Sequence, residues 1–228
     1  MAIEQESFDK LQHDITKVSA PPTSLQFELQ IPKFQLPESL RGLKILDIGA
    51  GASDLVRAFG ERGADAYAAD PRYSDLKDLE KRVKFHNARA PYNAIDRSAR
   101  RKSMDRFIGN YTRNPNKYVA AYAASLPFRD NSFDIAVSMN TVTVYLDSFY
   151  DLLLASVKEG LRVVKKGGTL QLCPFMEREV GFNSGVDNLR LANESRMVKE
   201  VMRDGLADVK VIPVISDINT LILTKTAV

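Results

Sequence analysis

The sequence predicts an α/β fold, with a seven-stranded, mostly parallel sheet, helices on both faces and a C-terminal antiparallel hairpin. From residue 43 onward, short apolar runs alternate with amphipathic, helix-like runs, and this alternation is typical of a parallel sheet covered by helices. The last two apolar runs, at 208–215 and 219–225, follow each other without a helix, which favours an antiparallel pair. The chain has 228 residues, 44% of them hydrophobic, which is enough for one such domain with a full core.

Residues 1–40 are predicted to form a short helix and an extended arm before the main domain. Apolar residues recur at helical spacing within 3–19, and prolines follow. Residues 25–31 then alternate between apolar and polar side chains, which is typical of a strand or an extended arm. We therefore assign 41–228 to the main domain.

The first half of the predicted sheet begins with the apolar run 43–49. Ser53 is a favourable N-cap for a helix that the sequence ends at Gly63. The next apolar run, 65–71, contains Asp70 at its end. Strand, helix and strand in this order predict the first βαβ unit of a parallel sheet.

The second half of the predicted sheet follows a long basic stretch. A long amphipathic helix is expected to bury one face, and a buried strand and a further helix follow it. The predicted elements are strands at 117–123, 132–140 and 169–175, helices at 147–164 and 186–204, and a buried helix face made of Phe149, Leu152, Leu153, Val157 and Leu161.

The positive charge of the chain is concentrated in one segment. The net charge is +3, but residues 72–117 contain 13 basic and 5 acidic residues. We interpret residues 86–117 as a basic helical insertion, with a helix near 94–108. The insertion contains Arg97, Arg100, Arg101 and Lys102, the aromatic residues Tyr92, Phe107 and Tyr111, and the apolar residues Met104 and Ile108.

Two interpretations of this insertion stay open. Basic residues within 97–113 can neutralise the phosphates of RNA, while Tyr92, Phe107 and Tyr111 stack on bases. Alternatively the helix is a lid that packs on the domain through Met104, Phe107 and Ile108, which is the more usual role of such a charged segment.

Cysteine and histidine usage excludes several classes of site. The single cysteine, Cys173, lies in an apolar run and cannot form an internal disulfide, which indicates a buried residue in a reducing compartment and predicts a cytoplasmic location. His13 and His86 lie beside no cysteine, so neither a zinc site nor a Ser-His-Asp triad is expected. No apolar run has the length that spans a bilayer, and residues 1–19 are too polar for a signal peptide.

The stretch LDIGAGASDL, residues 46–55, predicts a ligand-binding loop between the first strand and the first helix. Ligands of open parallel sheets bind beyond the carboxyl ends of the strands. A dinucleotide fingerprint would place a third glycine where this chain has Asp54, and that carboxylate would repel a pyrophosphate. Asp47 can face a cationic amine, and Asp70 can accept hydrogen bonds from ribose hydroxyls. These residues favour S-adenosylmethionine (SAM) over NAD, and they disfavour an NAD-dependent oxidoreductase.

With these motifs, the sequence resembles the class I SAM-dependent methyltransferases. Residues 47–53 are similar to the family's acid-x-Gly-x-Gly-x-Gly loop. LPFRDNSFDIAVSMN (126–140) resembles the approach to its fourth strand, and EGLRVVKKGGTLQL (159–172) its turn into the fifth. Together they cover about residues 41–175, in the correct order and at suitable spacing.

The resemblance implies roles for individual residues. The glycine loop would approach the methionine part of SAM, and acids on either side would hold the amino group and the ribose. These roles fall on Gly49, Ala50 and Gly51 for the methionine part, Asp47 for the amino group, Asp70 for the ribose, Pro71 or Arg72 for the adenine, and Asn140 beneath the sulfonium.

The sequence departs from the family at two positions. Ser53 replaces the third glycine of the loop. The family often has an acid for the adenine amino group four residues before LPF, where this chain has Tyr122. Either Tyr122 contacts the adenine, with Ala123 offering its backbone, or Tyr122 is a core residue on the third strand.

The resemblance implies transfer of a methyl group from SAM to a nucleophile, which leaves S-adenosylhomocysteine. We expect a small-molecule acceptor; an RNA acceptor and a non-catalytic SAM-binding module are the alternatives. No residue is identified as catalytic, no metal is expected, and the oligomeric state stays open.

Overall fold

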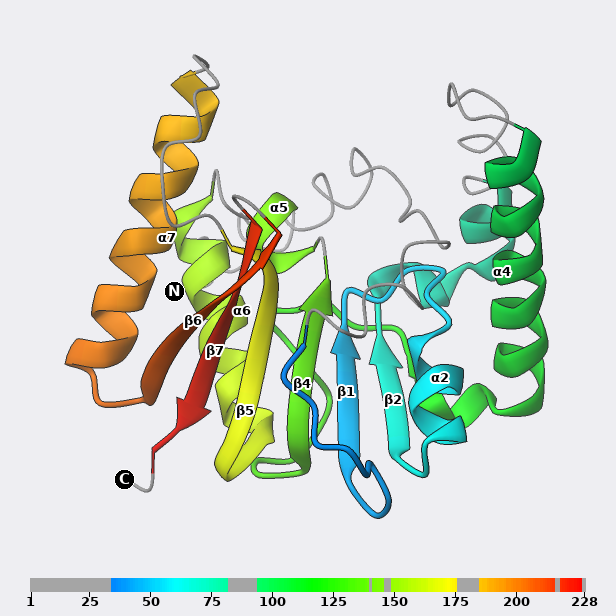
Figure 1. The fold of residues 1–228 in the computed structure, drawn as a ribbon, viewed down its shortest axis with the longest axis horizontal. Coiled ribbons are helices and arrows are strands. Elements are labelled where there is room, and N and C mark those ends of the chain that lie inside the picture. The colour runs from blue at the N-terminus through cyan, green and yellow to red at the C-terminus, as the bar shows by residue number, and fades with distance from the viewer. Residues whose placement is uncertain are drawn as a thin grey trace.

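The computed structural model contains the predicted seven-stranded sheet (Figure 1). It describes residues 34–81, 94–139, 141–145, 149–175, 185–215 and 218–226. The strands are β1 (Lys44–Ile48), β2 (Asp65–Ala69), β3 (Tyr118–Val119), β4 (Phe133–Met139), β5 (Val164–Phe175), β6 (Ala207–Ile215) and β7 (Ile218–Lys225). Their order in the sheet is β3-β2-β1-β4-β5-β7-β6. Strands β1 to β5 pair in parallel, and β7 pairs antiparallel with both β5 and β6, so the predicted fold class and terminal hairpin are confirmed.

Helices connect the parallel strands. They are α2 (Leu55–Glu61), the 3-10 helix η3 (Pro71–Ser74), α4 (Ala94–Arg113), the 3-10 helix η4 (Pro115–Lys117), α5 (Val142–Tyr145), α6 (Tyr150–Val163) and α7 (Gly185–Arg203). The prediction of Ser53 as the N-cap of α2 is wrong by one residue, because the N-cap is Asp54. Ser53 still contributes at the start of the helix, since its hydroxyl oxygen accepts a hydrogen bond from the N–H of Leu55 (3.1 Å). Figure 1 shows α4 and α7 standing at opposite ends of the sheet.

The third strand is shorter than the sequence predicts. The apolar run 117–123 contributes only two residues to β3, which pair with Ala68 and Ala69. The 3-10 helix η4 delays the start of the strand, and an isolated bridge between Tyr122 and Ser125 turns the chain away from the sheet. Tyr122 is therefore not a strand residue.

Two details around α6 also differ from the prediction. Phe149 is 38% exposed, because it precedes the first turn of α6 and so is not on the buried helix face. Strand β5 begins at Val164 rather than at residue 169, with a register shift in its pairing with β4. A glycine is required at position 168, where a Cβ would lie 2.5 Å from the carbonyl oxygen of Asp134.

The core consists of two clusters of buried side chains. Successive residues of β1 belong to different clusters, Ile45 to one and Leu46 to the other, because successive side chains of a strand point to opposite faces. The α6–α7 cluster includes Leu46, Ile48, Leu153, Val157, Leu161, Leu172, Met197, Val201 and Leu223. The α2–α4 cluster includes Ile45, Leu55, Phe59, Tyr73, Met104, Phe107, Tyr118 and Cys173. Burial of Cys173 confirms that it is a core residue.

The chain before residue 41 also contributes to the core. Phe34 and Leu40 are buried in the α2–α4 cluster. The amide of Gln171 on β5 binds the backbone of Gln35 twice: its Oε1 accepts from the N–H (2.8 Å) and its Nε2 donates to the carbonyl (2.9 Å). The predicted helix and arm within residues 3–31 lie outside the described residues.

Candidate functional site

The glycine loop lies where the carboxyl ends of β1 and β2 meet, as predicted. The N–H of Gly49 donates to the carbonyl oxygen of Ala69 at the end of β2 (2.7 Å). Gly49 and Gly51 have positive φ angles of 71° and 54°, which glycine adopts without steric cost. The two glycines therefore allow the chain to turn sharply out of the sheet.

Both backbone groups of Gly51 are bound by side chains from the β2 end. Its N–H donates to Oδ2 of Asp70 (2.9 Å), and its carbonyl accepts from the hydroxyl of Tyr73 (2.8 Å). The other oxygen of Asp70 accepts from the N–H of Arg72 (2.9 Å). A carboxylate has about four acceptor positions, so Asp70 can hold this loop and still accept hydrogen bonds from a hydroxyl group.

Asp47 is a buried carboxylate beside the loop. Its side chain is 2% exposed, and Oδ2 has no hydrogen-bond partner among the residues that the structure describes. Burial raises the pKa of Asp47 to about 7, with a smaller contribution from Asp70, while a hydrogen bond with Ser53 acts in the opposite direction. Burial also raises the pKa of Asp70. A cation placed against Asp47 would relieve this cost of burial.

Thr141 explains why position 49 is glycine. Its hydroxyl donates to the carbonyl oxygen of Gly49 (2.8 Å), which ties the loop to the end of β4. A Cβ at position 49 would lie only 2.1 Å from Cγ2 of Thr141. The space predicted for a ligand at Gly49 is thus partly used by this side chain.

Asp54 does not present an unpaired charge to a ligand, so the prediction that its carboxylate would repel a pyrophosphate is wrong. Its side chain is fully buried, and Oδ2 accepts from Arg57 Nη2 (2.9 Å) and from Arg106 Nε (3.0 Å). Two arginines therefore neutralise the carboxylate, and the sequence argument from Asp54 against a bound phosphate no longer holds. Among the described residues, no group of three His, Cys, Asp or Glu side chains could hold a metal ion.

The remaining predicted site residues lie at the same edge or outside the described part of the chain. Pro71 begins η3 directly after Asp70. Tyr122 and Ala123 are half-buried in the turn beyond β3, so the interpretation of Tyr122 as a core residue on a strand is wrong. A contact between Tyr122 and adenine stays a prediction, and Asn140 lies outside the described residues.

Helix α4 packs on the domain, as one of the two interpretations of the insertion expects. Met104 and Phe107 are buried, and Ile108 packs against the same cluster. The ring of Phe107 stacks on Tyr73 with a centroid distance of 6.1 Å. Phe107 is therefore unavailable for stacking on a base, and Tyr92 lies outside the described residues.

Three residues that shape the loop are not predicted from the sequence: Tyr73, Arg106 and Thr141. Tyr73 and Thr141 each follow a predicted ligand residue by only a few positions, and this proximity in sequence is a local signal that they lie near the loop. Arg106 lies 52 residues from Asp54 along the chain, and its role depends on tertiary packing.

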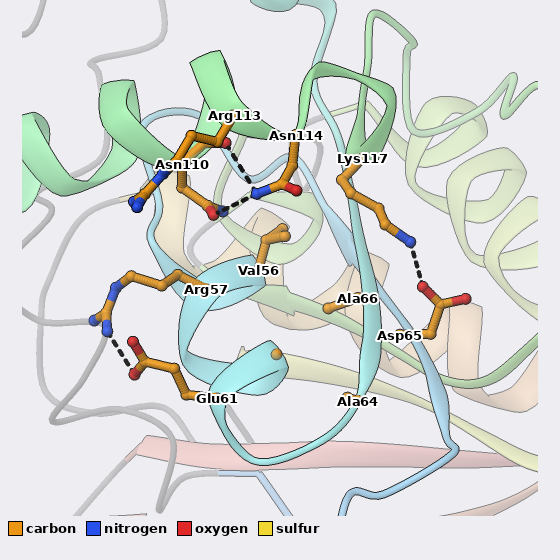
Figure 2. Close-up of a pocket in the computed structure, with 11 residues that line it drawn as sticks. Val56, Arg57, Glu61, Ala64, Asp65, Ala66, Asn110, Arg113, Asn114 and Lys117 are labelled. Carbon is orange, nitrogen blue, oxygen red and sulfur yellow. Dashed lines mark hydrogen bonds and ion pairs between the residues drawn. The ribbon is translucent and has the colours of Figure 1, made fainter.

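A separate cavity lies at the amino end of β2, away from the glycine loop. It has a volume of about 490 Å³. Figure 2 shows its lining residues, which come from α2, the start of β2 and the end of α4. Its polar residues largely bind one another: Arg57 pairs with Glu61, Lys117 with Asp65, and the amide of Asn114 with that of Asn110. We therefore place the candidate site at the loop rather than in this cavity.

Comparisons with known proteins identify the family of this chain. A family model described as a methyltransferase domain matches residues 46–172, which is more than half of the chain. This match begins within β1 and ends within β5, and thus includes the glycine loop, Asp70 and β4. The chain belongs to this methyltransferase family.

Two relatives share part of this region. Ubiquinone/menaquinone biosynthesis C-methyltransferase UbiE of Idiomarina loihiensis is 33% identical over 137 residues, which cover 59% of this chain and 43% of that protein. UbiE of Shewanella piezotolerans is 33% identical over 142 residues, with the same coverage of 59% and 43%. The match therefore spans less than half the length of these relatives.

A solved structure shows the same fold at low sequence identity. A SAM-dependent methyltransferase from Aquifex aeolicus is 17% identical, with a TM-score of 0.50, and the match covers 93% of this chain and 97% of that one. Family and fold together make the chain a class I SAM-dependent methyltransferase. The buried, unpartnered oxygen of Asp47 beside the loop fits the amino group of SAM.

Proposed function

We propose that the enzyme transfers the methyl group of SAM to a small-molecule acceptor, and that the accepting atom is carbon. Both relatives carry the name of a biosynthetic C-methyltransferase, which supports this choice. The observation that carries it against an RNA acceptor is the burial of Phe107, since the basic helix uses this aromatic face to pack on the domain.

We assign the cofactor to the loop at the carboxyl ends of β1 and β2. SAM supplies a methyl group on a positively charged sulfur, and its loss leaves S-adenosylhomocysteine. Asp47 would bind the amino group, Asp70 would accept hydrogen bonds from the ribose, and Gly49 to Gly51 would form the surface under the methionine part. Pro71, Tyr122, Ala123 and Asn140 complete the proposed site, in the roles that the sequence predicts.

The protein's contribution to the reaction is then the alignment of two reactants, because the sulfonium is already an excellent leaving group. Holding reactants in place can account for many orders of magnitude in rate. No helix within the described residues is long and apolar enough to cross a membrane. The cytoplasmic location stays a prediction from the cysteine usage.

Calorimetric titration with SAM tests the placement of the cofactor. We expect SAM to bind and NAD not to bind, and Asp70→Ala to weaken SAM binding roughly 10- to 150-fold, because hydrogen bonds to a charged group contribute about 1.5–3 kcal/mol. Asp208→Ala is the matched control, since Asp208 is exposed on β6. Equal affinity in Asp70→Ala and Asp208→Ala would show that the cofactor binds elsewhere.

The acceptor is tested by transfer of label from methyl-labelled SAM. The purified enzyme is incubated with the cell-extract fraction below about 3 kDa, which contains molecules small enough for an enzyme pocket. A parallel incubation contains bulk tRNA. We expect labelled product in the small-molecule fraction, with a methyl carbon whose NMR shift identifies a carbon–carbon bond. Label in tRNA alone would overturn the proposal.

A further inference from the structure

Gly51 of the glycine loop is held by side chains on both sides of its backbone. Its positive φ angle fixes the direction of the turn, and Asp70 binds its N–H. The carbonyl on the other side of the same residue accepts from the hydroxyl of Tyr73 at 2.8 Å, in a buried environment. The peptide group that joins Gly51 to Ala52 is therefore oriented by Tyr73.

The tyrosine is itself held rigidly. It lies in η3, three residues after Asp70, and its ring contacts three aromatic rings from other elements. The centroid distances are 6.1 Å to Phe107, 6.3 Å to Tyr111 and 5.5 Å to Tyr118. Burial and the nearby carboxylates of Asp70 and Asp47 raise the pKa of Tyr73 well above its usual range, so the hydroxyl stays a donor.

We propose that Tyr73 is a positioning residue for SAM, which holds the carbonyl of Gly51 so that the glycine loop and the Asp70 turn keep the geometry that receives the cofactor. This inference rests on the proposed placement of SAM at the loop. Phe107 and Tyr111 of α4 pack against the ring of Tyr73, so the inserted helix stabilises the glycine loop through this tyrosine.

Tyr73→Phe is the direct test, because it removes the hydroxyl and keeps the ring. Loss of one neutral hydrogen bond predicts a SAM dissociation constant roughly 3- to 10-fold higher, a similarly raised KM for SAM, and kcat within about twofold of wild type. Tyr118→Phe is the matched control. It removes a hydroxyl in the same cluster, one that accepts from Asn110 Nδ2 at 2.5 Å and does not bind the loop, so SAM affinity should stay unchanged.

Hydrogen exchange supplies a second measurement that does not depend on activity. In Tyr73→Phe, amides of the peptide covering residues 47–55 should exchange faster than in wild type, while strands β5 and β7 should keep their protection. In Tyr118→Phe the loop peptide should exchange at the wild-type rate. This comparison separates local loosening of the loop from a general loss of stability.

The outcomes distinguish this inference from the placement of the cofactor. If Tyr73→Phe binds SAM as tightly as wild type while Asp70→Ala binds weakly, the positioning role is wrong and the site stands. The role is also wrong if Tyr118→Phe weakens SAM binding as much as Tyr73→Phe does. If Asp70→Ala and Tyr73→Phe both keep wild-type affinity, the cofactor is not at this loop.

Discussion

The two core clusters differ in how they contact the glycine loop. The α6–α7 cluster is dominated by Leu, Val and other aliphatic side chains. The α2–α4 cluster differs because polar side chains in it and on the helix packed against it reach the loop. Tyr73 of the cluster binds Gly51, and Arg106 of α4 binds Asp54 before α2. This difference indicates that one cluster provides stability, whereas the other also determines the shape of the site.

Strand β1 illustrates the difference within a single element. Leu46 and Ile48 belong to the α6–α7 cluster, while Ile45 belongs to the α2–α4 cluster. Asp47 alternates with these residues and points to the same face as Ile45, and its charge acts on Tyr73 and Tyr118. A buried carboxylate is thus placed on the face that carries the loop.

The largest expected effect comes from Leu161→Ala in the α6–α7 cluster. Leu161 is 3% exposed in the last turn of α6. Truncation should lower the free energy of unfolding by about 3 kcal/mol, measured by urea denaturation. The SAM affinity of the folded protein should stay unchanged.

Phe107→Leu is the counterpart in the α2–α4 cluster. It should cost less stability, about 1–2 kcal/mol, but raise the SAM dissociation constant several-fold, because Phe107 stacks on Tyr73. Equal effects of Leu161→Ala and Phe107→Leu on SAM affinity would remove the distinction between the clusters.

Asp47→Asn should change the pH dependence of stability. The folded-state pKa of Asp47 is raised to about 7, against about 3.9 in an unfolded chain. The contribution of protonated Asp47 to stability is therefore fully present at low pH. It is lost as pH rises toward 7, because Asp47 ionises in the unfolded state at lower pH than in the folded state.

The asparagine variant has no carboxyl group to ionise at this position. The difference in free energy of unfolding between the variant and wild type should therefore shift by about 1.5 kcal/mol in favour of the variant from pH 5.5 to pH 7. Urea denaturation across this range measures the difference, and Asp208→Asn is the exposed control. Parallel stability profiles for Asp47→Asn and wild type would show that burial does not perturb Asp47.

These effects also show what the sequence could and could not predict. Alternating strand and helix patterns were sufficient for the seven-stranded sheet, and the acid–glycine spacing was sufficient to bring Asp47, Gly51 and Asp70 to one edge, because parallel strands end at the same side. The pairing of Asp54 with Arg106 was not accessible, since it joins residues 52 positions apart. For the same reason, the aromatic residues of the insertion could be read as base-stacking groups, whereas tertiary packing buries Phe107 against Tyr73.

The smallest expected effect tests the ionic contact between α4 and the loop region. Arg106 Nε binds Oδ2 of Asp54 at 3.0 Å, and the arginine side chain is 39% exposed while that of Asp54 is fully buried. Arg106→Gln should cost only about 1 kcal/mol of stability, because solvent screens the exposed partner and Arg57 still neutralises Asp54.

Arg113→Gln is the matched control on the same helix. Arg113 is exposed and its Nε donates to the carbonyl of Gly109 within α4, so we expect a change below about 0.5 kcal/mol. In high salt the cost of Arg106→Gln should shrink further, since screening weakens the pair in wild type as well. If Arg113→Gln destabilises the protein as much as Arg106→Gln, the general charge of α4 matters rather than the contact with Asp54. The support of the glycine loop by α4 would then depend on the aromatic packing of Phe107 and Tyr111 against Tyr73.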